Sequence, residues 1–299
     1  MAKRIFRIVR AVLLALAFIV VATAATLYAL SERRLDKRYP VAAQPVAART
    51  DSLGIARGAH LYRVLTCAIC HAEDGGGAVY EDAGPIGFLA GPNLTSGRGG
   101  VAQSRTDLDW VRAIRYGVRL DSTSLIVMPS EVFTRLNDAD LGAILGYLRQ
   151  LPPVDRELAP SHFRWLGRGL LATGRMNILV APKTRGNIER STVAEGATRE
   201  YGRYLADIAG CHGCHGFGLS GGRVAGPPDL PLASNLTPTG LRTWTEQQFF
   251  TVMRTGRRPD GTLLHEFMPW RAFRHMSDVE LTALWLYLAS VPPKAFGGK

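Results

Sequence analysis

The stretches Cys67-Ala68-Ile69-Cys70-His71 and Cys211-His212-Gly213-Cys214-His215 determine how this sequence is interpreted. Each has the form C-x-x-C-H, and together they contain all four cysteines of the chain. A single zinc ribbon is excluded, because its two CxxC pairs lie about 15–20 residues apart, whereas these pairs begin at positions 67 and 211. A thioredoxin-like motif does not require a histidine after the second cysteine. The pattern is the attachment signature of c-type haem.

The spacing within each motif explains this chemistry. Two thiols one short turn apart can each form a thioether with one haem vinyl group. The histidine that follows then lies under the iron as its proximal ligand. The sequence therefore predicts two covalently bound haem c groups with their iron, held by Cys67, Cys70 and His71 and by Cys211, Cys214 and His215.

An internal repeat supports this interpretation independently. Short segments around the first motif recur around the second in the same order, which predicts two tandem globular domains. The matched segments include Gly58-Ala59-His60-Leu61 with Gly202-Arg203-Tyr204-Leu205, Pro92-Asn93-Leu94-Thr95 with Ser234-Asn235-Leu236-Thr237, Met128-Pro129 with Met268-Pro269, and Asp138-Ala139-Asp140-Leu141 with Asp278-Val279-Glu280-Leu281.

The net charge of +11 is distributed unevenly along the 299 residues. Residues 1–50 carry +7, residues 51–155 carry −3, residues 156–195 carry +4 and residues 196–299 carry +3. Most of the excess flanks an N-terminal apolar segment, as expected at a membrane surface. No basic stripe with interleaved aromatic residues stands out, so no nucleic-acid partner is expected.

The N-terminal apolar segment predicts a membrane anchor. Residues 11–30 contain no charged residue, which is enough helix to cross a bilayer core of about 30 Å. Basic residues on both sides favour a retained anchor in a bacterial inner membrane, with the rest of the chain in the periplasm. The alternative is a cleaved signal peptide, for which Ala22-Thr23-Ala24 offers a cleavage site.

The expected organisation has five parts. Residues 1–38 form the anchor or signal peptide with its basic flanks, and residues 39–50 form a tether with two prolines. Residues 51–155 form the first haem domain, residues 156–195 the linker, and residues 196–299 the second haem domain. In the linker, residues 164–175 predict a short amphipathic helix that packs between the domains or, alternatively, lies near lipid headgroups.

The fold is expected to be all-α. Each repeat predicts an opening helix (53–66 and 197–209), a middle helix (107–116 and 246–255) and a last helix (138–150 and 278–290). The intervening stretches 74–100 and 216–240 are rich in Gly and Pro and are expected to be loops without strands. Gly58 and Gly202 predict a close crossing of the opening helix with the last helix, at Tyr147 and Tyr287.

Each motif leaves one axial position of the iron to be filled. Met128 and Met268 occupy equivalent places in the repeats, and each is followed by proline. Thioether ligation raises the reduction potential and leaves no site for oxygen or peroxide. The alternative is that both are core methionines, which fill gaps well. We predict Met128 and Met268 as the sixth ligands.

Further residues are expected around the haem groups. A ligating histidine donates its other ring N–H to a fixed acceptor, for which the carbonyls of Pro92 and Ser234 are the candidates. Arg119 and Arg258 share a Gly-x-Arg position and are candidates to pair with haem propionates, the alternative being a solvated surface face.

With these residues the sequence resembles class I c-type cytochromes, twice over. Gly91-Pro92-Asn93-Leu94-Thr95 is similar to the family segment in which the proline carbonyl holds the proximal histidine, whereas the second copy has serine at that place. The arrangement is also similar to cytochrome c subunits of membrane-bound periplasmic dehydrogenases. That resemblance implies two tandem cytochrome c domains that relay electrons from a dehydrogenase to the respiratory chain.

The favoured function is thus electron transfer without catalysis, with redox proteins as partners. Two alternatives remain open. A di-haem enzyme, of the peroxidase or thiosulfate-oxidising type, needs an open or cysteine-ligated iron. A cytochrome subunit of a haem-copper oxidase has the same function class but a different partner.

Overall fold

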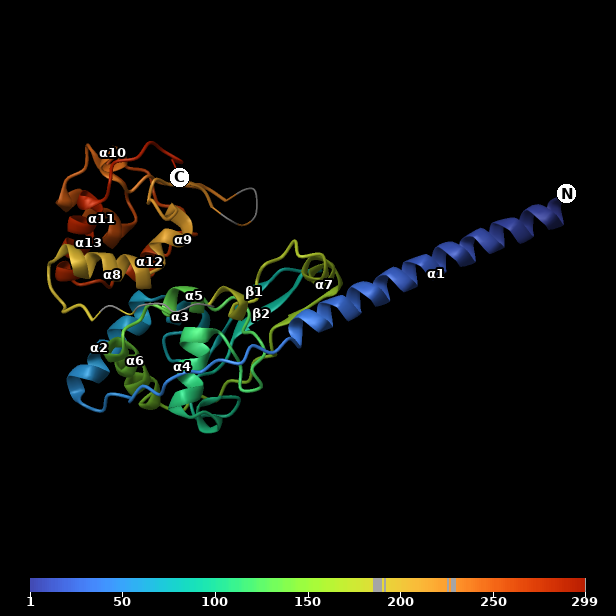
Figure 1. Cartoon of the computed structure of the whole chain (residues 1–299), viewed down its shortest axis with the longest axis horizontal. Coiled ribbons are helices and arrows are strands. Elements are labelled where there is room, and N and C mark those ends of the chain that lie inside the picture. The colour runs from blue at the N-terminus through green and yellow to red at the C-terminus, as the bar shows by residue number, and fades with distance from the viewer. Residues whose placement is uncertain (185–189, 191, 225, 227–229, 299) are drawn as a thin grey trace.

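The computed structural model describes residues 1–184, 190, 192–224, 226 and 230–298. Parts of the expected linker 156–195 and of the expected second domain 196–299 lie outside the described residues. Helix α1 (Ala2–Leu35) projects from two bodies that lie side by side, one for each repeat (Figure 1). We refer to residues 51–155 and 196–298 as the first and second repeat.

Both repeats contain the expected helices in the same order. The predicted middle helices are confirmed residue for residue, and the last helices within one residue. The first repeat contains α2 (Ser52–Val64), α3 (Cys67–His71), the 3-10 helix η1 (Ala102–Ser104), α4 (Asp107–Tyr116), α5 (Ser130–Phe133) and α6 (Asp138–Arg149). The second contains α8 (Arg199–Ile208), α9 (Cys211–His215), α10 (Pro238–Leu241), α11 (Glu246–Thr255), α12 (Trp270–Phe273) and α13 (Asp278–Ser290).

Side-chain caps explain where the main helices begin. Thr106 before α4, Thr245 before α11 and Ser277 before α13 each form a complete capping box with the residue three positions on. Asn137 caps α6 by accepting a hydrogen bond from the Asp140 N–H, while the Asp140 carboxylate points elsewhere. Each cap satisfies backbone N–H groups that have no partner inside the helix.

The close crossing predicted at Gly58 and Gly202 is confirmed. A Cβ atom at Gly58 would lie 2.0 Å from the Ala143 carbonyl oxygen and 2.8 Å from the Tyr147 Cβ. In the second repeat, a Cβ at Gly202 would lie 1.9 Å from the Ala283 carbonyl oxygen. The first and last helices of each repeat therefore touch backbone to backbone, which only glycine permits.

The expectation of an all-α chain is wrong in detail, because the described residues include short strands. In the region expected to be loop, β1 (Ala78–Asp82) pairs antiparallel with β2 (Gly87–Gly91), and β3 (His162–Phe163) from the linker adds to β2. A second, two-stranded pair joins β4 (Gly222–Arg223) to β5 (Leu232–Ala233). Gly and Pro in these stretches mark the turn of a hairpin instead of a continuous loop.

The expected tether at residues 39–50 is also wrong, because this segment packs along the first repeat. Tyr39 and Val46 are each only 6% exposed, and the Arg49 N–H donates to the Gly142 carbonyl at 2.9 Å. A Cβ at Gly146 would lie 1.9 Å from the Arg49 carbonyl oxygen. Two glycines on α6 thus leave space for residues 39–50, and the buried apolar side chains of this segment stabilise its position.

The amphipathic helix of the linker forms as α7 (Trp165–Ala172), but it does not pack between the repeats. It lies against β2, β3 and the last turns of α1. The Arg168 guanidinium contacts the Glu32 carboxylate and donates to the Ser31 hydroxyl at 3.0 Å. The remaining linker element is the 3-10 helix η2 (Ala181–Lys183). Helix α7 therefore joins the first repeat to α1.

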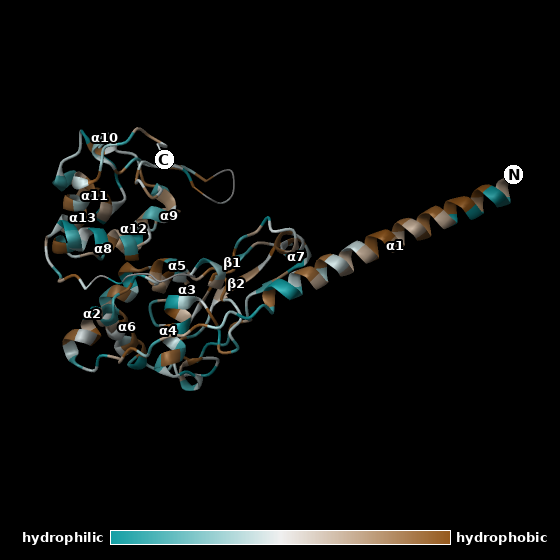
Figure 2. Ribbon diagram, in the orientation of Figure 1, coloured by the Kyte–Doolittle hydropathy of each residue, from teal (hydrophilic) through white to brown (hydrophobic). Residues whose placement is uncertain are grey.

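Helix α1 is apolar over most of its length and projects into open space. Among the described residues it is the one helix long and apolar enough to cross a membrane, and none of its apolar stretch is buried. Figure 2 shows this apolar run, which contrasts with the alternation of hydrophilic and hydrophobic residues along the ribbons of the two bodies. A helix that is apolar on all sides needs an apolar environment.

A reciprocal set of contacts joins the two repeats. His60 on α2 lies with its Nε2 2.7 Å from the Glu280 carboxylate on α13, and the Tyr204 hydroxyl on α8 donates to Asp140 on α6 at 2.7 Å. His60 corresponds to Tyr204 in the repeat, and Asp140 corresponds to Glu280. Reciprocal contacts of this kind are typical of a two-fold interface. The two repeats therefore face each other like the halves of a pseudo-symmetric dimer.

Arg57 lies at the centre of this interface. Its Nε is 3.0 Å from Asp140 and its Nη1 is 2.9 Å from Glu280, while its Nη2 donates to the Tyr201 hydroxyl at 3.0 Å. The side chains of Arg57, Asp140 and Glu280 are 12%, 9% and 3% exposed. Burial alone lowers the pKa of Arg57, but the hydrogen bond and charge of Asp140 outweigh it, so the pKa is raised.

Candidate functional site

The two CxxCH segments adopt the same backbone conformation. Each forms a five-residue helix, α3 or α9, that begins after a residue in the left-handed region, Thr66 (φ 65°) or Gly210 (φ 75°). Each ends at a residue with positive φ and extended ψ, Ala72 (φ 59°, ψ 166°) or Gly216 (φ 77°, ψ 160°). The local fold around each motif is thus copied between the repeats, although the flanking residues differ.

The first motif is held in a strained conformation that the second avoids. Thr66 and Ala72 have positive φ values that are uncommon for residues with a Cβ, whereas the second repeat has glycine at both places. The Tyr62 hydroxyl donates to the Ala72 carbonyl at 2.7 Å and fixes this residue. Ala206 occupies the position of Tyr62 in the second repeat, where no such support is required.

Both motif histidines have one ring nitrogen engaged. The Nδ1 of His71 lies 2.9 Å from the Pro92 carbonyl oxygen, and the Nδ1 of His215 lies 2.7 Å from the Ser234 carbonyl oxygen. A carbonyl can only accept, so Nδ1 carries the proton and Nε2 of the neutral ring keeps its lone pair. Burial lowers the pKa of both histidines, and the carbonyl only partly opposes this. Each Nε2 is therefore prepared to bind a metal.

None of the four cysteines belongs to a disulfide, and their surroundings disfavour the thiolate. Burial raises the pKa of Cys67 and of Cys211 to about 12, and it raises the pKa of Cys70 and Cys214 as well. A thiol–disulfide exchange site needs a lowered pKa, because the thiolate is the nucleophile. The environment therefore disfavours thiol redox chemistry.

Met128 and Met268 lie at equivalent points of the two repeats. Each immediately precedes the proline before a short helix, α5 or α12, and each is partly buried against the apolar core. Cys67 and Cys211 pack against the same core. This arrangement leaves both methionines available as haem ligands, and ligation stays a prediction.

The two arginines expected near haem propionates make equivalent contacts in the two repeats, each with a hydroxyl four residues on and a carbonyl five residues on. Arg119 contacts the Ser124 carbonyl, four residues before Met128, and burial lowers its pKa. Arg258 is held in the equivalent loop, with its Nη1 3.2 Å from the Leu263 carbonyl. Their contact with propionates remains a prediction.

One residue that the sequence did not single out is Arg105. Its Nε and Nη1 are buried and have no hydrogen-bond partner among the described residues. The charge of Arg105 adds to burial in lowering the pKa of Arg119, so the two guanidiniums are neighbours. The guanidinium of Arg105 lies over the Trp110 ring, 5.6 Å from its centroid, and the charge of Asp109 only partly offsets the effect of burial on the pKa of Arg105. Buried N–H groups need acceptors, and the carboxylates of haem would supply them. The second repeat has Trp244 at the equivalent position, so aligning the two repeats shows Arg105 as a charge without a counterpart.

The histidine inside the second motif, His212, contacts the helix before the motif. His212 does not face open solvent, because its Nε2 lies 3.3 Å from Asp207 on α8 and its side chain is 19% exposed. It therefore braces α9 against α8 instead of serving as a spare ligand.

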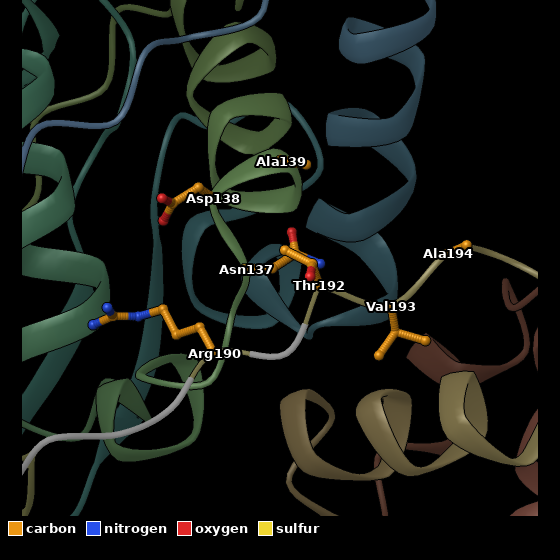
Figure 3. Close-up of a pocket in the computed structure, with 7 residues that line it drawn as sticks. All are labelled: Asn137, Asp138, Ala139, Arg190, Thr192, Val193 and Ala194. Atoms are coloured by element: carbon orange, nitrogen blue, oxygen red, sulfur yellow. The ribbon is translucent and has the colours of Figure 1, made fainter.

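A cavity of about 360 Å³ lies away from both motifs. Figure 3 shows it at the start of α6, beneath the chain that connects the repeats. Its lining contains Asp138 and Arg190 but no cysteine, histidine or methionine. Among the described residues it therefore brings together none of the predicted haem-binding side chains and is not the candidate site.

The donor set fits covalent haem: each motif has two cysteines outside any disulfide and a histidine whose Nε2 is free, and the first repeat adds the partly buried Arg105. Comparison with known proteins agrees, because residues 55–152 match the Cytochrome c family. This stretch is a cytochrome c domain. Such a domain carries haem c bound through the two cysteines of its CxxCH motif.

Similar proteins extend the likeness beyond this cytochrome c domain. The chain is 27% identical over 278 residues to the fructose dehydrogenase cytochrome subunit of Gluconobacter japonicus, which covers 86% of this chain and 56% of that protein. It is 26% identical over 267 residues to the cytochrome c subunit of the alcohol dehydrogenase (quinone) of Gluconobacter oxydans, covering 81% and 55%. The gluconate 2-dehydrogenase cytochrome c subunit of Pantoea cypripedii is 28% identical over 273 residues, covering 80% and 60%. The chain thus spans little more than half the length of these relatives.

Proposed function

We propose that this protein is a membrane-anchored di-haem c-type cytochrome that carries electrons in the periplasm between a dehydrogenase and the respiratory chain. The observation that carries the proposal is the duplicated site. Both repeats have a CxxCH helix of the same conformation, a histidine whose Nδ1 is held by a carbonyl, and a methionine at the equivalent position. The second repeat is thereby proposed as a second cytochrome c domain.

Each side chain has a defined part in this proposal. Cys67 and Cys70, or Cys211 and Cys214, would form the thioethers. His71 with Met128, and His215 with Met268, would ligate the two irons. Bound haem supplies a one-electron iron couple. The protein orients each histidine through its carbonyl partner, and the methionine of each pair would leave no ligand position of the metal open to water or oxygen.

The interface between the repeats supports transfer from one site to the other. Gly210, which caps α9, approaches α5 of the first repeat so closely that a Cβ there would lie 3.4 Å from a Val132 methyl group. The Met128 loop of one repeat therefore adjoins the CxxCH helix of the other. The Arg57 network keeps these segments together, so the two sites would act as one rigid unit.

The likeness to dehydrogenase cytochrome subunits supports a dehydrogenase as the redox partner. Helix α1 is long and apolar enough to serve as the anchor. Complementary charge on the mildly acidic first repeat and the basic second repeat would guide docking of different partners. Co-purification from membranes distinguishes a dehydrogenase partner from an oxidase partner.

Carbon monoxide binding to the reduced protein tests the proposal. With both sixth positions filled by methionine, the native protein binds none at neutral pH. Met128→Leu and Met268→Leu, which conserve volume, each open one iron and bind one carbon monoxide per chain. Met176→Leu, at a linker methionine, is the matched control and binds none. Binding by the native protein, or no binding by either site variant, contradicts the proposed ligand set.

A further inference from the structure

Helix α7 offers a surface that the proposed function does not use. It packs beside α1 at the point where the apolar run of α1 ends (Figure 1). Trp165, the first residue of α7, is 74% exposed. An exposed tryptophan beside a membrane-spanning helix is the arrangement found at membrane–water interfaces.

The height of α7 along α1 follows from the contacts of Arg168. Its guanidinium carbon lies 4.2 Å from the centroid of the Tyr28 ring, and the guanidinium also contacts Ser31 and Glu32. Tyr28 is two residues from the end of the uncharged run 11–30, which is about 3 Å along the helix axis. Arg168 therefore lies at the level where the apolar core of a bilayer would meet its headgroups.

Trp165 lies at nearly the same level. Residues three apart on a helix are neighbours on one face, with Cβ atoms about 5–6 Å apart. Trp165 stands in this relation to Arg168. Each interfacial region of a bilayer is about 5–8 Å thick, so the exposed indole falls within it. Tyr28 and Trp165 then form the aromatic pair at the membrane boundary.

The surrounding charge is complementary to phospholipid headgroups. Arg33, Arg34, Lys37 and Arg175 are all exposed close to this junction. A Cβ built at Gly174 would lie 3.4 Å from the Arg34 guanidinium, which places the basic end of α1 beside the end of α7. Arginine forms strong charge-assisted hydrogen bonds with phosphate. The patch thus combines an apolar anchor with phosphate-binding cations, as interfacial helices do.

We propose that α7 is an interfacial helix, with Trp165 seated among phospholipid headgroups beside the exit of α1. The inference rests on the proposed membrane anchor. It assigns α7 a role beyond packing, because it would hold the first repeat against the membrane surface. The Arg168 contacts with Tyr28 and Glu32 fix α7 to α1, so the orientation of the repeat relative to the bilayer is set.

The test uses the full haem-loaded chain in nanodiscs containing phosphatidylglycerol. A photoreactive phenylalanine analogue replaces Trp165, Leu16 in the apolar run, or Phe217, which is 92% exposed in the second repeat. After illumination, mass spectrometry detects lipid adducts. We expect adducts at positions 16 and 165 and none at 217.

Adducts at position 16 without adducts at 165 overturn the inference and leave the anchor intact. Adducts at 217 as frequent as at 165 also overturn it, because contact would then be unspecific. Absence of adducts at position 16 refutes the anchor and the inference together. Trp165 is exposed, so its replacement leaves the fold undisturbed, and the haem absorption spectrum checks this for each variant.

Discussion

Replacement of Arg57 by alanine tests whether the two repeats are joined by a buried ionic network. Arg57 contacts Asp140 and Glu280, whose side chains are 9% and 3% exposed. Removing the cation leaves two buried carboxylates without a guanidinium, so that Asp140 keeps Tyr204 and Glu280 keeps His60 as a partner. Breaking a buried pair by removing one partner costs about 3–5 kcal/mol, so the free energy of unfolding should fall by at least about 3 kcal/mol.

Arg63→Ala is the matched control, because Arg63 lies on the same helix and forms an ion pair with Glu73. Those side chains are 51% and 67% exposed, and such surface pairs contribute about 0–1 kcal/mol. Both variants replace arginine by alanine in α2, so the change in helix propensity is shared. Arg57→Lys keeps the charge but loses the planar guanidinium that bonds several partners at once. We expect its loss in the free energy of unfolding to lie between those of Arg63→Ala and Arg57→Ala.

Urea titration at neutral pH, followed by helix circular dichroism and by haem absorbance, measures both effects. Because Arg57 connects the repeats, the fall in the free energy of unfolding should appear both in circular dichroism and in haem absorbance. If Arg57→Ala and Arg63→Ala differ by less than about 1 kcal/mol, the network does not stabilise the interface and the argument fails.

Three further predictions concern the fold around the sites. Gly58→Ala places a Cβ 2.0 Å from a backbone oxygen, so calorimetry should show that the free energy of unfolding falls by about 1–3 kcal/mol or more. The control is Gly169→Ala, whose Cβ would have no atom within 4 Å and which should not destabilise the fold. In Gly216→Ala the new Cβ meets no atom within 4 Å, so any loss in the free energy of unfolding, about 1–3 kcal/mol, reports backbone strain. Ala72→Gly relieves such strain and should lower the free energy of unfolding less, or raise it. Equal losses for the two variants in urea titrations would argue against strain. Burial raises the pKa of Glu280, but His60, the Ser277 N–H and Arg57 outweigh it and lower the pKa to about 2. Its contribution to stability is therefore complete above pH 4.5 and is lost as the pH falls towards 2. Glu280→Gln should flatten this acid dependence, and an unchanged slope between these pH values contradicts the assignment.

The helices and their crossings followed from local patterns in the sequence. The last helices begin after the caps Asn137 and Ser277, as their local sequence favours, and Gly58 and Gly202 predict the backbone contacts. These features depend on a few neighbouring residues, and the repeat displayed each of them twice. The carbonyl partners of both motif histidines could be named in advance for the same reason.

Features that depend on distant segments were missed or misplaced. The β1–β2 hairpin has a turn signal at Gly84-Pro85, but the many Gly and Pro residues of the stretch 74–100 predict a loop, and the strand β3 that extends the pair comes from the distant linker. Residues 39–50 pack on α6 through Gly142 and Gly146, whose purpose is visible only once the chain lies beside them.

The Arg57 network was invisible to local patterns, because it joins positions 57, 140 and 280. Asp140 and Glu280 lie three residues after the caps Asn137 and Ser277, where an acidic residue is common for local reasons alone. Only the packing of α2 against α6, and the contact of Arg57 with α13 across the interface, reveal their second partner. Similarly, Arg105 is one arginine among many in the sequence, and its unpaired buried nitrogens identify it in the structure.

The central claim is that this chain carries two haem c groups, one in each repeat. Intact-mass measurement of the denatured protein, purified from membranes, tests it most directly. The account predicts polypeptide plus two haem masses, falling to one haem when Cys211 and Cys214 are replaced by serine. A mass corresponding to one haem or none in the native protein would contradict it.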